Sequence, residues 1–256
     1  MQVFYLSPAS GSQFKAVIKL KYPYVLINYM TKLSKHFAKI VRQFCRILLI
    51  DSGGFPSSFI YNGYKDSDER YLAFVKSVKA DYFVLRDYPC EPQILKKFNT
   101  SVRDQIHKTL EHHIKLLDLF ERSNLNAQPI PVIQGWKIED YLYCLDLFDE
   151  YGLLGKFDYI AIGSTCRRHQ VKYTQRIILT IRKELPKRKR LHAFGVKLSV
   201  LRNKAVWDSL YSVDSSAWDY PSRFKQIDHY DYCLNYVNKL KELEIEFAKQ
   251  GVLNGV

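Results

Sequence analysis

The chain has 256 residues, 47% of them hydrophobic, and a net charge of +13 at neutral pH. This length fits one large domain or two small ones, and the apolar content is ample for a buried core, which argues against intrinsic disorder. No apolar run reaches the roughly 18 residues needed to span a bilayer, and the first residues lack the pattern of a signal peptide, so we expect a cytoplasmic protein without a membrane span.

Short runs of β-branched and aliphatic residues recur along the chain, each followed by a turn and then by a helical pattern. Continuous apolar runs of this kind are typical of strands buried on both faces. The first half of the chain has such runs at residues 3–7, 24–29, 46–51 and 81–87. The second half has them at residues 130–135, 158–164, 191–197 and 210–216.

Two of the intervening segments are clearly amphipathic. Residues 102–122 repeat apolar side chains along one helical face, and Ser101 with Asp104 resembles a capping pair at the start. A second helix is predicted around residues 236–247. Eight strands alternating with helices are typical of a parallel barrel or a doubly wound sheet. Because eight strands close a barrel and about 250 residues build one, we predict an α/β fold, a (β/α)8 TIM barrel forming a single domain over residues 1–256.

Polar residues stand at the ends of most of these strands. The active sites of such barrels lie at the carboxyl ends of the strands, so these residues are expected to converge on one rim. They are Asp51, Asp87, Gln134, Gly163, Lys197 and Asp214. Gly53 and Gly54, which follow Asp51, allow a sharp turn and a close approach to a flat ligand.

Four short motifs, taken in order, resemble the tRNA-guanine transglycosylase superfamily. They are DSGGF at 51–55, VIQG at 132–135, AIGS at 161–164 and VDS at 213–215. The resemblance covers roughly residues 24–220. It implies a TIM barrel that forms a covalent glycosyl-enzyme intermediate, releases guanine and installs a 7-deazaguanine.

The resemblance also implies roles for the two carboxylates that would do the chemistry. Asp214 matches the nucleophile that attacks C1′ of the target nucleotide, and Asp51 matches the group that exchanges a proton with the leaving and incoming bases. Such a reaction needs one carboxylate that stays ionised and one that passes a proton. Read without the resemblance, Asp51 could equally cap the helix after the DSGG turn.

Five further positions match the base-binding residues of the superfamily. Asp87 would bind the N–H groups of the base, Gln134 its carbonyl edge, and the backbone N–H of Gly163 would be a donor. Phe55 and Phe194 would sandwich the heterocycle. Structural alternatives stay open: Asp87 as a turn cap, Gln134 as a satisfied core amide, and the phenylalanines as ordinary core residues.

The sequence also departs from the tRNA-directed members of the superfamily. Those members carry a zinc site of three clustered cysteines and a histidine after the last strand, where this chain has only Cys233 and His229. Pro56 follows DSGGF in place of the usual glutamine. We therefore predict no metal and no zinc-binding subdomain. The chain looks most like the DNA 7-deazaguanine transglycosylase (DpdA-type) branch, and we favour DNA over tRNA.

The positive charge and the aromatic content of 14% suit a polyanion partner. The most basic stretch, Lys187–Arg190, precedes a strand and so falls on the face opposite the chemistry, where we interpret it as a solvated loop. Trp136 and Trp218 could stack on a flipped nucleotide or simply pack in the core. The predicted phosphate contacts follow the last three strands: Arg167, Arg168, His169, Lys172, Lys197, Arg202, Lys204, Arg223 and Lys225.

Taken together, these features predict a pentosyltransferase that replaces guanine in DNA with a free 7-deazaguanine base, 7-cyano-7-deazaguanine (preQ0) being the expected one. No cofactor is required. Two alternatives remain open. One is a tRNA-guanine transglycosylase on a reduced scaffold, and the other is a non-catalytic nucleic-acid-binding barrel, although two retained carboxylates argue against the second.

Overall fold

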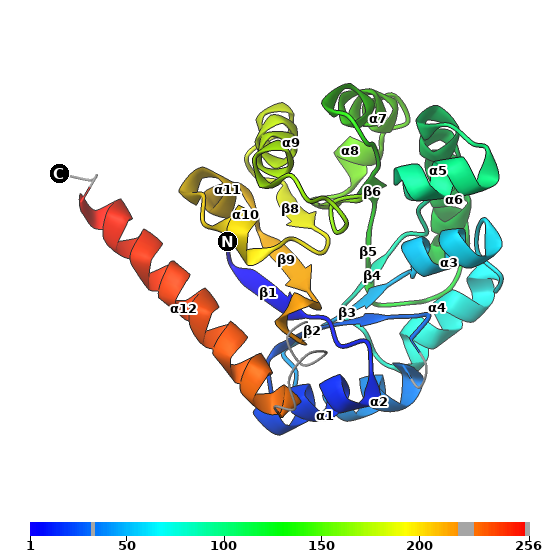
Figure 1. The fold of residues 1–256 in the computed structure, drawn as a ribbon. Helices are drawn as coiled ribbons and strands as arrows, with labels where there is room; N and C mark the ends of the chain where they lie inside the picture. The colour runs from blue at the N-terminus through cyan, green and yellow to red at the C-terminus, as the bar shows by residue number, and fades with distance from the viewer. Residues whose placement is uncertain (32–33, 220–227, 254–256) are drawn as a thin grey trace.

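A ring of parallel strands surrounded by helices makes up the fold (Figure 1). The computed structural model describes residues 1–31, 34–219 and 228–253. The strand segments are β1 (Val3–Leu6), β2 (Tyr24–Asn28), β3 (Ile47–Asp51), β4 (Tyr82–Val84), β5 (Gln128–Ile130), β6 (Val132–Ile133), β7 (Tyr159–Ile162), β8 (Arg190–Ala193) and β9 (Ser212–Ser215). All eight predicted runs contain strand, and every pairing is parallel.

The nine segments form an eight-stranded barrel because β5 and β6 are two halves of one strand. The sheet runs β5-β4-β3-β2-β1-β9-β8-β7-β6, so its two ends meet at Pro131. Proline has no N–H to donate to a ladder, but the Pro131 carbonyl still accepts from the N–H of Ala161 at 2.9 Å. The predicted (β/α)8 barrel is confirmed.

The helices cover the outside of the ring. They are α1 (Gly11–Leu20), α2 (Ser34–Val41), α3 (Gly54–Tyr61), α4 (Asp68–Ser77), α5 (Pro92–Phe98), α6 (Val102–Glu121), α7 (Ile138–Glu150), α8 (Leu153–Lys156), α9 (Val171–Glu184), α10 (Leu198–Leu201), α11 (Lys204–Ser209) and α12 (His229–Leu253). The predicted capping pair of α6 is present, since Ser101 Oγ accepts from the N–H of Asp104 and Asp104 returns the bond. The last helix, α12, lies beside α1 (Figure 1).

Two hydrophobic clusters hold the barrel together. The larger one fills the space between strands and helices, and the smaller one fills the lumen. Toward the amino ends of the strands, which we call the lower end of the lumen, the cluster is aromatic and contains Tyr5, Tyr82, Tyr159 and Tyr211. Four of the five cysteines are buried and none forms a disulfide, as expected of small core residues. None of the helices in the described part of the chain combines the length and the apolar character needed to cross a membrane.

Strand alternation decides which side chains reach the rim. Side chains two residues apart on a strand point to the same face. Leu49, Val132 and Ser212 point into the lumen. The side chains two residues further on therefore also point inward, at the carboxyl end of the barrel: Asp51 after Leu49, Gln134 after Val132 and Asp214 after Ser212. The same alternation that fills the lumen with apolar side chains therefore places polar side chains at the carboxyl end of the barrel.

Candidate active site

A cavity of about 220 Å³ opens at the carboxyl ends of the strands. Its walls come from β2, β3, β9, the start of α3 and the loops that follow β1, β4, β6, β7 and β8, so segments far apart in the sequence meet there. The predicted site residues that line it are Asp51, Gly54, Phe55, Asp87, Gln134, Gly163, Arg167, Phe194 and Asp214. Asn28, Glu91, Ser164 and Cys166 also line it.

The carboxylate of Asp214 is held by the loop that follows β8. Its Oδ1 accepts a 2.8 Å hydrogen bond from the N–H of Gly195, and the Nε2 atom of His192 lies 3.4 Å from the same oxygen. Gly195 has a φ of +61°, and a Cβ there would stand 2.2 Å from the Cβ of Cys166. Only glycine fits this position, so the donor to Asp214 depends on it.

Asp51 lies at the carboxyl end of β3, which β2 and β1 separate from β9 around the barrel, and it has different hydrogen-bond partners from Asp214. Its Oδ2 accepts a 2.6 Å hydrogen bond from Asn28 Nδ2, and the two residues are register partners on β2 and β3. The Asn28 amide is itself oriented, since its Oδ1 accepts from the N–H of Met30 at 2.9 Å. Burial, followed by the negative charges of Asp87 and Asp214, raises the pKa of Asp51 to about 7. This carboxyl can therefore both release and take up a proton near neutral pH.

Asp87 is buried in a network of hydroxyl and amide donors. Its Oδ1 accepts from Ser52 Oγ at 3.1 Å and its Oδ2 accepts from Gln134 Nε2. The Tyr64 hydroxyl donates to the Asp87 carbonyl and accepts its N–H, both at 3.0 Å. Burial raises the pKa of Asp87 to about 6, while the Gln134 and Ser52 hydrogen bonds act in the opposite direction. These hydrogen bonds hold the carboxyl in a defined position.

A third buried acid, Glu91, was not predicted from the sequence. Ser164 Oγ lies 2.9 Å from Glu91 Oε2 and 2.8 Å from Gln134 Oε1, and it accepts the N–H of Cys90. Burial raises the pKa of Glu91 to about 7. Ser164 has a φ of +51°, a strained conformation for a residue with a side chain and one that recurs at functional sites. Because Ser164 Oγ lies against Gln134 Oε1, the amide keeps its Nε2 toward Asp87.

The expected donor role of Gly163 is wrong in this structure. The Gly163 N–H donates to the Ile133 carbonyl at 2.9 Å as part of the ladder between β6 and β7. What Gly163 provides is space, since a Cβ there would lie 2.3 Å from Gln134 Nε2. The missing side chain lets the Gln134 amide cross the strand end to reach Asp87.

The two glycines of the DSGGF turn have different structural roles. Gly53, with a φ of +77°, is the N-cap residue of α3, and Gly54 packs so closely that a Cβ would lie 2.8 Å from Asp87 Oδ1. Only Gly54 of the two lines the cavity. Phe55 and Phe194 both line it, and the guanidinium of Arg167 lies 4.1 Å from the centre of the Phe55 ring at its mouth.

These residues can be compared with known proteins. A family model, DpdA: DeoxyPurine in DNA protein A, matches residues 26–233. The chain belongs to the DpdA family. A search of the curated proteins finds no match. Membership confirms the resemblance drawn from the four motifs and supports a transglycosylase-type enzyme that modifies DNA.

In this DpdA family member, the predicted phosphate contacts divide into two groups. Arg167, His169, Lys172 and Arg202 are exposed in the segments that follow β7 and β8. All four side chains are accessible to solvent, and Arg167 also lines the cavity. Arg223 and Lys225 lie outside the described residues.

Three other predicted contacts are buried or paired within the protein, and a fourth, Lys197, does not line the cavity. Arg168 is buried and donates to the carbonyls of Ser164 and Trp136 and to the Tyr141 hydroxyl. Trp218 is only 2% exposed, which rules out stacking on a nucleotide without unfolding its surroundings. Lys197 lies outside the cavity lining as the N-cap residue of α10. Lys204 pairs with Asp208 at 2.6 Å, and Asp208 lines a cavity at the other end of the barrel. Charge alone does not distinguish these structural roles from a surface role.

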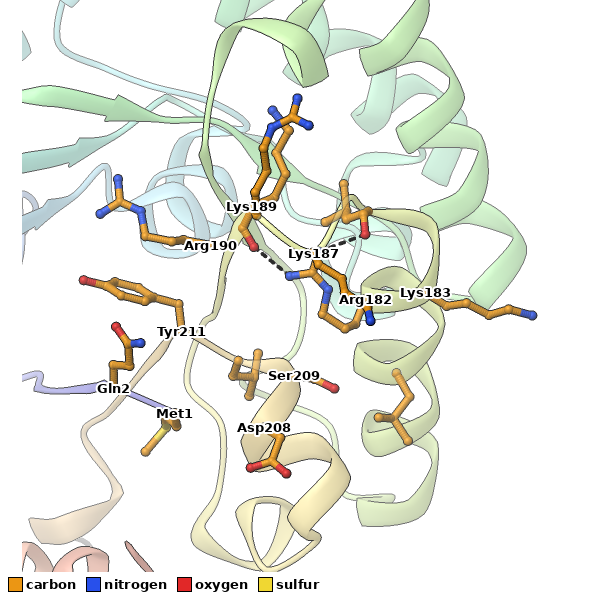
Figure 2. A pocket seen from close by; sticks show the side chains of 14 residues that line it. Met1, Gln2, Arg182, Lys183, Lys187, Lys189, Arg190, Asp208, Ser209 and Tyr211 are labelled. Atoms are coloured by element: carbon orange, nitrogen blue, oxygen red, sulfur yellow. Dashed lines mark hydrogen bonds between the residues drawn. The ribbon is translucent and has the colours of Figure 1, made fainter. Parts of the chain in front are cut away.

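The basic stretch Lys187–Arg190 lies at the amino end of the barrel, as predicted (Figure 2). There it borders a cavity of about 970 Å³ together with Met1 and Tyr211. The expectation of a fully solvated loop is wrong for two of the four residues. Lys189 is buried and donates to the Phe157 carbonyl, and the Arg190 guanidinium lies about 5 Å from the Tyr159 and Tyr211 ring centres. Arg190 thus packs against the aromatic lower end of the lumen.

Proposed function

We propose that this chain exchanges guanine in DNA for a free 7-deazaguanine base by double displacement. The observation that carries the proposal is the pairing of Asp214 and Asp51 in one cavity with unlike environments. Asp214 accepts a backbone hydrogen bond at Oδ1 and has no hydrogen bond to Oδ2 from any described residue, whereas Asp51 has a pKa near 7. One group suits a nucleophile and the other suits a proton carrier.

In the first half-reaction, an Asp214 oxygen attacks C1′ of the target deoxyribose. The C1′–O bond forms, the C1′–N9 bond of guanine breaks, and the proton on Asp51 passes to the leaving base. In the second half-reaction, the incoming base gives its proton to the Asp51 carboxylate and attacks C1′. The ester to Asp214 then breaks, so both carboxyl groups return to their starting forms.

Recognition of the base falls to the opposite wall. Asp87 would accept from the N–H groups of the base, and Gln134 retains a second amide N–H beyond the one that it gives to Asp87. That hydrogen suits the carbonyl edge of guanine and of a 7-deazaguanine alike. Phe55 and Phe194 would cover the two faces of the ring, and preQ0 is the incoming base that we propose.

The DNA would be bound by exposed cations near the cavity. Arg167 lies at the cavity mouth, and His169, Lys172 and Arg202 are exposed in the segments after β7 and β8. Since a stacked base hides its C1′, the target nucleotide must be flipped or single-stranded. The small cavity volume suits one base rather than a paired one.

The test is incorporation of labelled guanine and labelled preQ0 into DNA and, separately, into bulk tRNA, with wild type, Asp214→Asn and Asp51→Asn. We expect label in DNA from the wild type and at least about 1,000-fold less from Asp214→Asn, because a nucleophile has no substitute. Label in tRNA alone would move the protein to the tRNA-directed reaction. Binding of DNA without any label would support the non-catalytic alternative.

A further inference from the structure

His192 lies directly beneath the proposed nucleophile and has no role in the reaction described so far. It is fully buried in the lumen on β8, where its register partner is Ser212, two residues before Asp214 on β9. Its Nε2 atom is 3.4 Å from Asp214 Oδ1. Among the described residues, that nitrogen has no hydrogen-bond partner of good geometry. A buried ring nitrogen without a partner costs free energy, so its placement beside a carboxylate calls for a reason.

The other ring nitrogen is held by a short chain of hydroxyl groups. His192 Nδ1 is 2.8 Å from Ser212 Oγ, which is 2.5 Å from the Tyr159 hydroxyl. If Tyr159 donates to Ser212 and Ser212 donates to Nδ1, the ring carries its hydrogen on Nε2 and points it at Asp214. The reverse order would turn an Nε2 lone pair toward a carboxylate oxygen, which is repulsive. The chain of hydroxyls and the nearby carboxylate therefore favour a ring with its hydrogen on Nε2.

We propose that His192 is a positioning residue for Asp214, an assignment that rests on the function proposed above. The Gly195 N–H and the His192 Nε2–H both face Oδ1, so together they fix the carboxylate and leave Oδ2 for C1′. A modest turn of the carboxylate would close the 3.4 Å gap. When the ester later breaks, the same two donors receive the returning negative charge.

Packing alone is the competing explanation. The His192 ring lies against aromatic neighbours, with the Phe194 ring centre at 4.5 Å and that of Tyr5 at 6.0 Å. A leucine would fill much of the same space without an N–H, whereas a glutamine would bring an amide N–H toward Asp214. The two substitutions separate the effect of the donor from that of volume.

The experiment measures the rate of covalent protein–DNA adduct formation in a single turnover without incoming base, for wild type, His192→Leu and His192→Gln. The dissociation constant for DNA and the melting temperature are measured on the same samples. We expect the leucine variant to form the adduct about 100-fold more slowly with DNA affinity unchanged, because small misplacement of a reacting group has this effect. The glutamine variant should recover at least a tenth of the wild-type rate.

Ser212→Ala provides a second perturbation that keeps the imidazole. Removal of its hydroxyl releases the ring, and we expect an adduct rate about 10-fold below wild type with unchanged DNA affinity. Wild-type rates in both His192→Leu and Ser212→Ala would overturn the assignment, as would a glutamine variant as slow as the leucine variant. Absence of any adduct from the wild type would overturn the proposed function and this role together.

Discussion

Replacement of Asp51 by asparagine should stabilise the protein at alkaline pH while it removes the exchange reaction. The pKa of Asp51 is raised from 3.8 to about 7 because the carboxylate is buried beside Asp87 and Asp214. Below pH 4 the folded and unfolded chains both hold this proton. Between pH 4 and pH 7 only the folded chain keeps it, so stability falls as pH rises, and above pH 7 the full cost of a buried charge is present.

The size of the effect follows from the width of that window. One unit of pKa corresponds to about 1.4 kcal/mol, so the cost that develops between pH 5 and pH 7 is on the order of 3 kcal/mol for a pKa near 7. Asparagine does not ionise, and it keeps the acceptor oxygen that Asn28 uses. Relative to wild type, Asp51→Asn should therefore gain roughly that amount in free energy of unfolding between pH 5 and pH 8.

Urea unfolding of both proteins at pH 5 and pH 8 measures this difference. Asp104→Asn is a control of opposite sign, since hydrogen bonds from the Ser101 N–H and hydroxyl lower the pKa of Asp104. In the wild type, the ionised Asp104 carboxylate stabilises the folded chain throughout that pH range, and this contribution is lost only on further acidification. Asp104→Asn should therefore be less stable than wild type at both pH 5 and pH 8. A wild-type to Asp51→Asn difference that stays constant from pH 5 to pH 8 would refute the assignment of a costly ionisation to Asp51.

Two further predictions concern the loop after β8 and the DNA-binding surface. Gly195→Ala and Gly152→Ala both place a side chain at positive φ, at a cost of roughly 1–2 kcal/mol. Only the new Cβ at position 195 meets another side chain. Gly195→Ala alone should therefore lose more stability than this shared cost, and more than 90% of the exchange rate in a labelled-guanine assay. Equal melting temperatures and rates for the two variants would contradict the close packing on Cys166. Arg167→Ala should reduce the slope of log affinity for DNA against log salt by about 0.9, whereas Arg188→Ala, at the other end of the barrel, should leave it unchanged. The reverse result in a salt titration would place the DNA on the opposite face.

The sequence predicts the barrel well because most of the strands lie in short runs of mainly apolar residues. Eight such runs, at the spacing of βα units, leave few other architectures. The division of a strand at Pro131 is not predicted, and it changes the strand count but not the closure of the sheet. Asp51 and Asp214 are found by the same route, since each lies at or near the carboxyl end of a strand and side-chain alternation places it above a lumen residue.

Residues that act through a partner on another strand are harder to predict. Asn28 also ends a strand, yet its importance appears only in the register that sets it opposite Asp51. Glu91 and His192 are a turn residue and a mid-strand residue, and nothing in their own segments distinguishes them from structural residues. Arg168 shows the converse error: its charge predicts a surface role, but carbonyl and hydroxyl acceptors surround its buried guanidinium. Such contacts depend on distances across the fold that a linear pattern does not contain.

The arrangement of the site also explains why its acids need so much support. Asp51, Asp87 and Glu91 line one small cavity, and burial is the largest cause of the raised pKa of each. The lumen below these acids is filled by aromatic and aliphatic side chains and excludes water. The low dielectric raises the free-energy cost of ionising each carboxyl group, and it also strengthens each hydrogen bond that a carboxyl group accepts. Hydrogen-bond donors such as Asn28, Ser52 and Ser164 hold these groups in defined positions. A rim selected only for stability would carry apolar residues at these positions, so three acids kept there at a cost in stability are best explained by the chemistry that needs them.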